Sequence, residues 1–200
     1  MNRNIKIINK LQKIVSEKPY EYQAVSDLFE MARIVEQDNP KLAHSINKDL
    51  RNLIPQQVRN IKNDLETREK FYFLNKRCLL FDAKVDFDAY MQYIEYDREP
   101  EKRFYLPRRK QIFPIVQALQ DLEDDKLDLL TISTPPGVGK TTLGIFFLTW
   151  VMGKYPASCN LASAHSAMLT NSFYDGVLSI ITDPGIHLHR LGRPETKGGI

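Results

Sequence analysis

The sequence predicts an α/β fold, in which a parallel sheet, incomplete within these 200 residues, follows a mainly helical N-terminal region. Residues 127–133 form an apolar run of strand length, and residues 159–164 are a second run of strand type. Between them, residues 142–152 place apolar side chains at helical spacing. The order strand, turn, helix, strand is typical of a parallel sheet with helical crossovers, and it predicts this fold class.

Residues 1–100 are predicted to form a separate helical domain, and residues 101–200 the beginning of the sheet-containing domain. Two helices with apolar residues at helical spacing come first and are separated by prolines. A third helix is expected over residues 42–53 and a fourth over 56–74, because Pro55 disfavours helical backbone in the residue before it.

Three aspartates, Asp82, Asp86 and Asp88, follow the fourth predicted helix. A metal site is one reading of such a group, but Asp88 as the N-cap of a helix that begins with Ala89 is the simpler interpretation, with the other two solvated. Aromatic residues crowd between positions 71 and 96, and we interpret them as packing residues rather than as a base-stacking surface.

The composition is that of an ordinary globular protein, with 42% hydrophobic residues and a formal net charge of +3. This charge permits contact with nucleic acid without requiring it. No apolar stretch reaches the length of a membrane span, and polar residues interrupt the N-terminus, so we expect an intracellular protein with no membrane contact. Cys78 and Cys159 lie far apart in apolar surroundings and are expected to be buried thiols.

Residues 134–142 read Thr-Pro-Pro-Gly-Val-Gly-Lys-Thr-Thr, which is a phosphate-binding loop between the first predicted strand and a helix. Backbone N–H groups of such a loop, together with the positive end of the helix dipole, bind a triphosphate. Lys140 is expected to reach the β- and γ-phosphates of ATP as the catalytic lysine, and Thr141 to ligate Mg²⁺. The expected nucleotide-binding residues of the loop are Pro136, Gly137, Val138, Gly139, Lys140, Thr141 and Thr142.

The loop departs from the usual pattern because Thr134 stands where a glycine normally begins it. Pro135 and Pro136 fix their own φ angles and remove two N–H donors, so the phosphate cradle is expected to begin at Gly137. The alternative interpretation is a Gly/Pro turn followed by a solvated lysine.

The segments on either side of the loop are also informative. Residues 97–111 concentrate arginine and lysine around an aromatic pair and lead into a predicted helix over residues 112–122. A further helix is expected over residues 167–182. His165 and Ser166 follow the second predicted strand, at the edge of a sheet where ligands commonly bind.

Taken together, these motifs resemble the large terminase subunit of tailed bacteriophages. The resemblance covers about residues 104–182, from the Pro-Arg-Arg-Lys-Gln lead-in, through the loop and a Trp-containing helix, to Leu-Ala-Ser-Ala-His-Ser. It implies a homo-oligomeric motor that uses ATP hydrolysis to move double-stranded DNA into a capsid in the bacterial host cytoplasm. The implied partners are the portal and the small terminase subunit, and a nuclease domain is expected only in the full-length protein.

The resemblance also implies that Gln111 reads the edge of adenine, while Phe104 or Tyr105 stacks on the base. A glutamine side chain both donates and accepts hydrogen bonds, which suits N6 and N7 of adenine. The alternative for Gln111 is a solvated side chain at the start of a helix.

Two departures from the family affect the expected activity. Many relatives have arginine at the position of Gly137, so this chain requires another source: Arg108, Arg109, an arginine beyond residue 200 or a neighbouring subunit. In addition, no acidic strand is evident, since residues 177–183 have the spacing of a helix end. We therefore expect nucleotide binding with poor hydrolysis by these 200 residues. The alternatives are a P-loop helicase or translocase, a nucleotide-gated binding module without turnover, and a small-molecule P-loop kinase.

Overall fold

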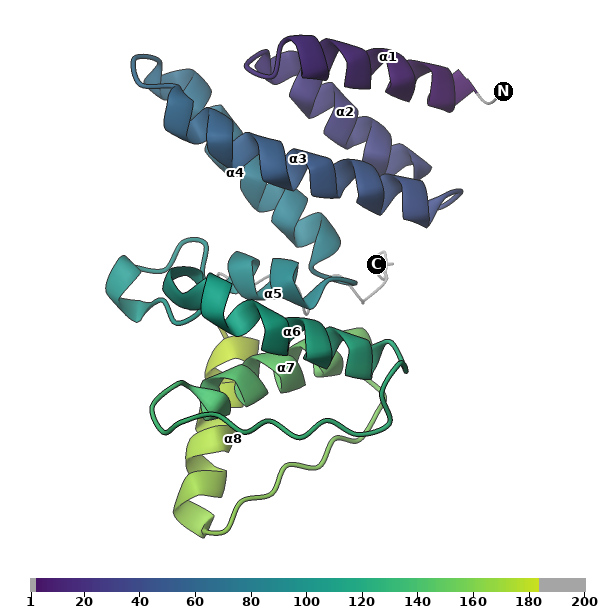
Figure 1. Cartoon of the computed structure of the whole chain (residues 1–200). Coiled ribbons are helices and arrows are strands. Elements are labelled where there is room, and N and C mark those ends of the chain that lie inside the picture. The colour runs from purple at the N-terminus through teal and green to yellow at the C-terminus, as the bar shows by residue number, and fades with distance from the viewer. Residues whose placement is uncertain (1–2, 184–200) are drawn as a thin grey trace, which may run out of the picture. The chain divides into compact units, whose positions relative to one another are not determined.

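The computed structural model describes residues 3–183, which fold into helices joined by turns and extended segments (Figure 1). They divide into two compact units, of which the first ends at Asp82 and the second begins at Ala83. The helices of the first unit are α1 (Arg3–Glu17), α2 (Tyr22–Val35), α3 (Pro40–Asn60) and α4 (Leu65–Asp82). Those of the second are α5 (Phe87–Ile94), η1 (Pro100–Lys102), η2 (Leu106–Arg108), α6 (Arg109–Glu123), α7 (Lys140–Lys154) and α8 (Ala167–Ile181).

The first unit is a helical bundle in which α2 packs on α1, α3 and α4, and α3 packs along α4. Each helix contributes an apolar face to a common core, because apolar residues recur every three or four positions along it. Side chains that are almost completely buried include Ile8, Val25, Phe29, Ala32, Ile46, Leu50, Ile54, Phe71 and Leu74. The prediction of a helical N-terminal region is in agreement with this bundle.

Helix α3 continues through Pro55 to Asn60, so the prediction of separate helices over residues 42–53 and 56–74 is wrong in its boundaries. Proline removes one intrahelical hydrogen bond. Here Ile54 and Gln57, on either side of it, are buried against the bundle. The packing of that face outweighs the lost bond and keeps the helix continuous.

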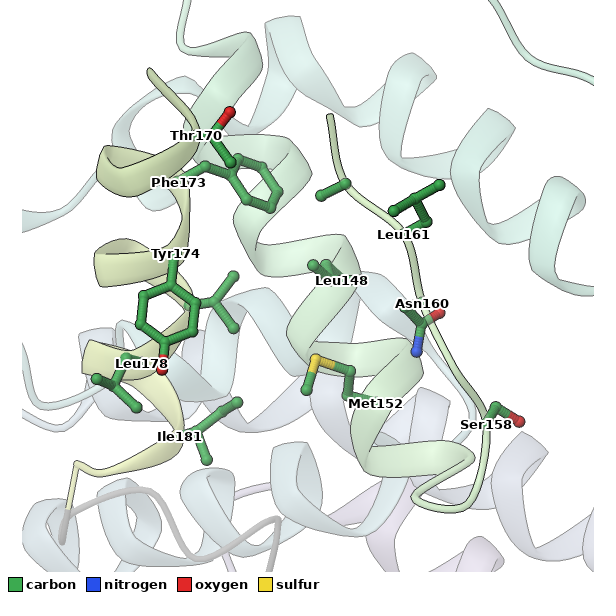
Figure 2. Close-up of a pocket in the computed structure, with 12 residues that line it drawn as sticks. Leu148, Met152, Ser158, Asn160, Leu161, Thr170, Phe173, Tyr174, Leu178 and Ile181 are labelled. Atoms are coloured by element: carbon green, nitrogen blue, oxygen red, sulfur yellow. The ribbon is translucent and has the colours of Figure 1, made fainter. Parts of the chain in front are cut away.

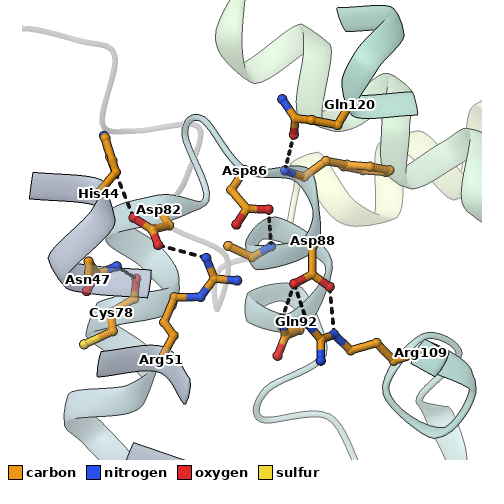
Figure 3. Close-up of polar contacts among 12 residues, drawn as sticks. His44, Asn47, Arg51, Cys78, Asp82, Asp86, Asp88, Gln92, Arg109 and Gln120 are labelled. Carbon is orange, nitrogen blue, oxygen red and sulfur yellow. Dashed lines mark hydrogen bonds and ion pairs between the residues drawn. The ribbon is translucent and has the colours of Figure 1, made fainter. Parts of the chain in front are cut away.

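A buried ionic cluster joins α3 to α4 (Figure 3). Asp82 accepts a hydrogen bond from Arg51 Nη1 at 2.8 Å and lies 2.8 Å from His44 Nδ1, and its side chain is 3% exposed. Asn47 Nδ2 donates to the carbonyl oxygen of Cys78 at 2.8 Å in the same interface. Asp82, expected to be solvated, is therefore a structural ion-pair partner.

The two cysteines differ in environment. Cys78 is buried, as expected, and burial raises the pKa of its thiol. Cys159 is exposed, contrary to the prediction of a second buried thiol.

The second unit is built around α7, which packs against α5 and α8, while α5 also packs against α6. Trp150 of α7 is buried and donates from Nε1 to the carbonyl oxygen of Ala83 at 2.8 Å. Tyr90 of α5 donates to Thr149 Oγ1 at 2.7 Å. Because α5 and the segment after it pack with α6 and α7, the second unit begins at residue 83 rather than at the expected residue 101.

The predicted α/β fold with a parallel sheet is wrong for this structure, since residues 3–183 contain no β-strand. Residues 127–133 and 159–164, the two predicted strands, are irregular segments. Their apolar side chains are largely in solvent, with Leu129 80% and Leu161 96% exposed. A strand exists only when its N–H and C=O groups pair with a neighbour, and these segments do not form a ladder with each other.

The helices of residues 3–183 are all too short or too polar to cross a bilayer. The helices expected over residues 112–122, 142–152 and 167–182 are confirmed as α6, α7 and α8. Residues 184–200 of the expected second domain lie outside the described residues.

Replacing Asp82 with alanine is expected to lower the free energy of unfolding by about 3–5 kcal/mol, because it breaks the buried ion pair with Arg51 and the contact with His44 between α3 and α4. Chemical denaturation of the Asp82→Ala variant measures this loss. Lys70→Ala is the control, since it removes an exposed ion pair with Glu66 on α4. An Asp82→Ala variant as stable as Lys70→Ala would contradict a structural role for the cluster.

Candidate phosphate-binding site

Two glycines of the loop before α7 have a left-handed backbone conformation. Gly137 has φ of +80° and Gly139 has φ of +95°, a region that other residues rarely occupy. Gly139 is the N-cap of α7, whose first turn begins at Lys140 and has no side-chain cap. The first N–H groups of this 15-residue helix are thus left for a ligand or solvent.

The side chain of Lys140 folds back onto the start of the loop. Its ammonium donates to the carbonyl oxygen of Thr134 at 2.5 Å, and Lys140 is otherwise exposed. Within residues 3–183, no carboxylate pairs with Lys140 or bonds to residues 136–142. A positive charge without a counter-charge beside unpaired helix N–H groups is suited to bind an anion.

Two hydroxyl-bearing residues of the loop lie in the first turn of α7. Thr141 is exposed in the first turn of α7 and Thr142 is half-buried behind it. The Thr141 side chain is therefore accessible from solvent. The described residues contain no cluster of three or more His, Cys, Asp or Glu side chains able to hold a metal ion by themselves.

The ring of Phe104 packs directly against Gly139. A side-chain carbon added at Gly139 would overlap the Phe104 ring, whereas one added at Gly137 would meet open space. Phe104 also packs edge-on against Phe146 of α7, with ring centroids 6.2 Å apart. The lead-in segment and the phosphate-binding loop therefore meet at one aromatic side chain.

Glu95 fixes the backbone that holds Phe104. Its carboxylate is fully buried and accepts hydrogen bonds of 2.8–2.9 Å from the N–H groups of Phe104, Tyr105 and Leu106. One carboxylate satisfying three successive N–H groups imposes a tight turn on the lead-in segment. Sequence reasoning missed Glu95, because a single glutamate at the end of a helix has no distinguishing pattern.

Asp88 forms a second buried anchor for the same segment (Figure 3). Both its oxygens accept from Arg109, at 2.8 Å each, and Tyr105 donates its hydroxyl to Oδ1. Hydrogen bonding to Asp88 raises the pKa of Arg109. Asp86, not Asp88, is the N-cap of α5 and accepts from Ala89 N–H at 3.2 Å.

Phe104, Tyr105 and Gln111, the residues expected around adenine, have different environments in the structure. Tyr105 is fully buried and bonded to Asp88, so it is not available to stack on adenine. Phe104 is half-buried beside the loop. Gln111 is exposed in the first turn of α6, and within the described residues no hydrogen bond joins it to residues 136–142.

His165 and Ser166, which follow the second extended segment, lie at the start of α8. Ser166 is the N-cap of α8 and accepts from Leu169 N–H, while His165 is exposed. The N–H group of Asp183 donates to the carbonyl oxygen of Ile180 at 3.4 Å, just after the end of α8. This confirms the interpretation of residues 177–183 as a helix end.

A groove between α7, α8 and residues 158–162 is separate from the phosphate-binding loop (Figure 2). Its lining is mainly apolar and includes Leu148, Met152, Leu161, Phe173, Tyr174 and Leu178. No loop residue lines it, and it contains no charged side chain. The groove is therefore unsuited to hold the phosphates of a nucleotide.

Comparisons with protein-family models, with curated proteins and with solved structures find no match to this chain.

Exchanging each loop glycine for alanine is expected to separate backbone strain from overlap with Phe104. Gly137→Ala is expected to lower the free energy of unfolding by about 1–2 kcal/mol, because alanine is strained at positive φ. Gly139→Ala carries the same strain and in addition a steric overlap with the Phe104 ring. Urea unfolding is expected to show the larger loss for Gly139→Ala. Equal losses in the two variants would rule out the packing of Phe104 on Gly139.

Glu95→Gln is expected to loosen the lead-in segment. Whichever way the amide is turned, its NH₂ group faces the N–H of either Phe104 or Leu106, which leaves a donor unsatisfied at a cost of about 1–3 kcal/mol. Hydrogen exchange at residues 104–106 should become faster. Glu99→Gln, an exposed glutamate paired with Lys102, is the control and should leave these amides unchanged.

Proposed function

We propose that this chain binds Mg²⁺-ATP at residues 136–142. The observation that supports the proposal is the combination of two glycines at positive φ, a helix N-terminus without a side-chain cap, and a lysine that no carboxylate of residues 3–183 pairs with, all within seven residues. Lys140 binds the β- and γ-phosphates, the loop N–H groups enclose them, and the Thr141 hydroxyl completes the coordination of Mg²⁺.

The larger role that we propose is the ATP-binding part of a viral DNA-packaging motor, acting on double-stranded DNA in the bacterial host cytoplasm. This part of the proposal is supported by the sequence resemblance over about residues 104–182, and the all-helical fold of the described residues gives it no support. In such a motor, ATP hydrolysis drives DNA movement, and the portal and small terminase subunit are the partners.

A nucleotide-gated binding module is the second candidate function. Hydrolysis requires a group that positions the attacking water and a carboxylate that orients Mg²⁺. No carboxylate contacts residues 136–142 within the part of the chain that the structure describes. This observation favours nucleotide binding with little turnover by these residues.

Calorimetric titration with Mg²⁺-ATP tests the site. Lys140→Ala is expected to weaken binding by about 10- to 100-fold, since it removes charge-assisted hydrogen bonds to the phosphates. Lys84→Ala, which removes an exposed lysine elsewhere in the second unit, should bind as the unsubstituted chain does. Failure of the unsubstituted chain to bind Mg²⁺-ATP would refute the nucleotide site.

Hydrolysis with and without double-stranded DNA separates the two candidate functions. DNA-stimulated release of phosphate that is lost in Lys140→Ala would support the motor. Binding that depends on Lys140, without turnover in either condition, would support the binding module.

A further inference from the structure

The four arginines between residues 97 and 111 have different environments, and two of them are committed to structural contacts. Arg103 donates to the carbonyl oxygens of Arg98 and Tyr96, at 2.7 and 3.1 Å. Arg109 is held by both oxygens of Asp88. Both guanidinium groups therefore already use part of their donor set within the second unit, and the charge of Arg109 is paired with Asp88.

The other two arginines stack on aromatic rings. The guanidinium carbon of Arg98 lies 5.8 Å from the centroid of Phe146, a core residue of α7. That of Arg108 lies 5.7 Å from the centroid of Phe104, the ring that packs on Gly139. Arg108 is exposed, and within residues 3–183 it has neither an ion-pair partner nor a side-chain hydrogen bond.

The position of Arg108 beside the loop is fixed by the fold rather than by its own side chain. Its backbone N–H donates to the carbonyl oxygen of Tyr105 at 2.9 Å, and Tyr105 N–H is in turn held by Glu95. The guanidinium lies within cation–π range of the Phe104 ring, and Arg108 is exposed, so this contact leaves the side chain accessible to a ligand. A planar, permanently charged group held in this way loses little freedom when it binds an oxyanion.

We propose that Arg108 binds the phosphates of the nucleotide held by residues 136–142, as a second cation beside Lys140. This inference rests on the proposed nucleotide site. It selects Arg108 from the possible phosphate-binding arginines, which the sequence alone did not distinguish. Guanidinium N–H groups pair with phosphate oxygens in the same geometry as with carboxylates. Arg109, the other nearby candidate, is excluded because Asp88 already neutralises it.

Titration of the whole chain with two ligands tests the proposal. Mg²⁺-ATP carries a base and three phosphates, whereas inorganic tripolyphosphate with Mg²⁺ carries phosphates alone. Arg108→Ala is expected to weaken both ligands by about tenfold, and Arg108→Lys by less, because lysine keeps the charge without the planar fork. Lys110→Ala is the matched control, since it removes one exposed positive charge two residues further along α6.

The possible outcomes are distinct. Weaker binding of both ligands by Arg108→Ala, with Lys110→Ala unchanged, supports a direct phosphate contact. Loss of ATP binding alone would overturn the proposal in favour of a base-stacking role for the Phe104–Arg108 pair. Equal losses in Arg108→Ala and Lys110→Ala would reduce the effect to general charge and also overturn it.

Failure of this inference is separable from failure of the nucleotide site. If Lys140→Ala abolishes binding while Arg108→Ala binds normally, the site stands and the role of Arg108 is refuted. If the unsubstituted chain binds neither ligand, both proposals fail. Because the Arg108 side chain is exposed and unpaired within the described residues, thermal unfolding should be unchanged in Arg108→Ala, which confirms that the comparison is made between folded proteins.

Discussion

The buried carboxylate of Glu95 is the interaction on which the candidate site depends. By accepting three successive backbone N–H groups, it converts a charged, proline-containing segment into a fixed turn at the end of α5. An isolated buried carboxylate is unstable, so the three N–H groups are as necessary to Glu95 as it is to them. Asp88 accepts hydrogen bonds from the side chains of Tyr105 and Arg109, and so provides a second anchor for the same segment.

This turn gives the phosphate-binding loop a neighbour that sequence order alone does not provide. Phe104 packs against Gly139, which lies 35 residues further along the chain. Its ring leaves no room for a side chain at position 139. Gly139 is consequently required twice, once for its positive φ and once for close approach. Gly137 is required for its φ alone, which distinguishes two glycines that are equivalent in the motif.

Prediction from sequence succeeded where the determining forces are local. Helices α6, α7 and α8 were found from the spacing of apolar residues, which depends on the residues of each helix alone. Prediction failed where the outcome depends on partners elsewhere in the chain. Residues 127–133 have the composition of a strand, but Leu129 is 80% exposed, because strand composition does not supply a neighbouring strand.

The sequence by itself determined the helical periodicity and the glycine-containing turn before α7, since both depend on contacts within a few residues. Only the tertiary structure decided which carboxylates are structural, which of Phe104 and Tyr105 is beside the loop, and which of Arg108 and Arg109 pairs with Asp88. Those choices depend on burial and on hydrogen bonds between separate segments, such as Asp88 with Arg109. Aspartates or arginines that are alike in the sequence acquire different roles because each ionic group must find its own partner when water is excluded.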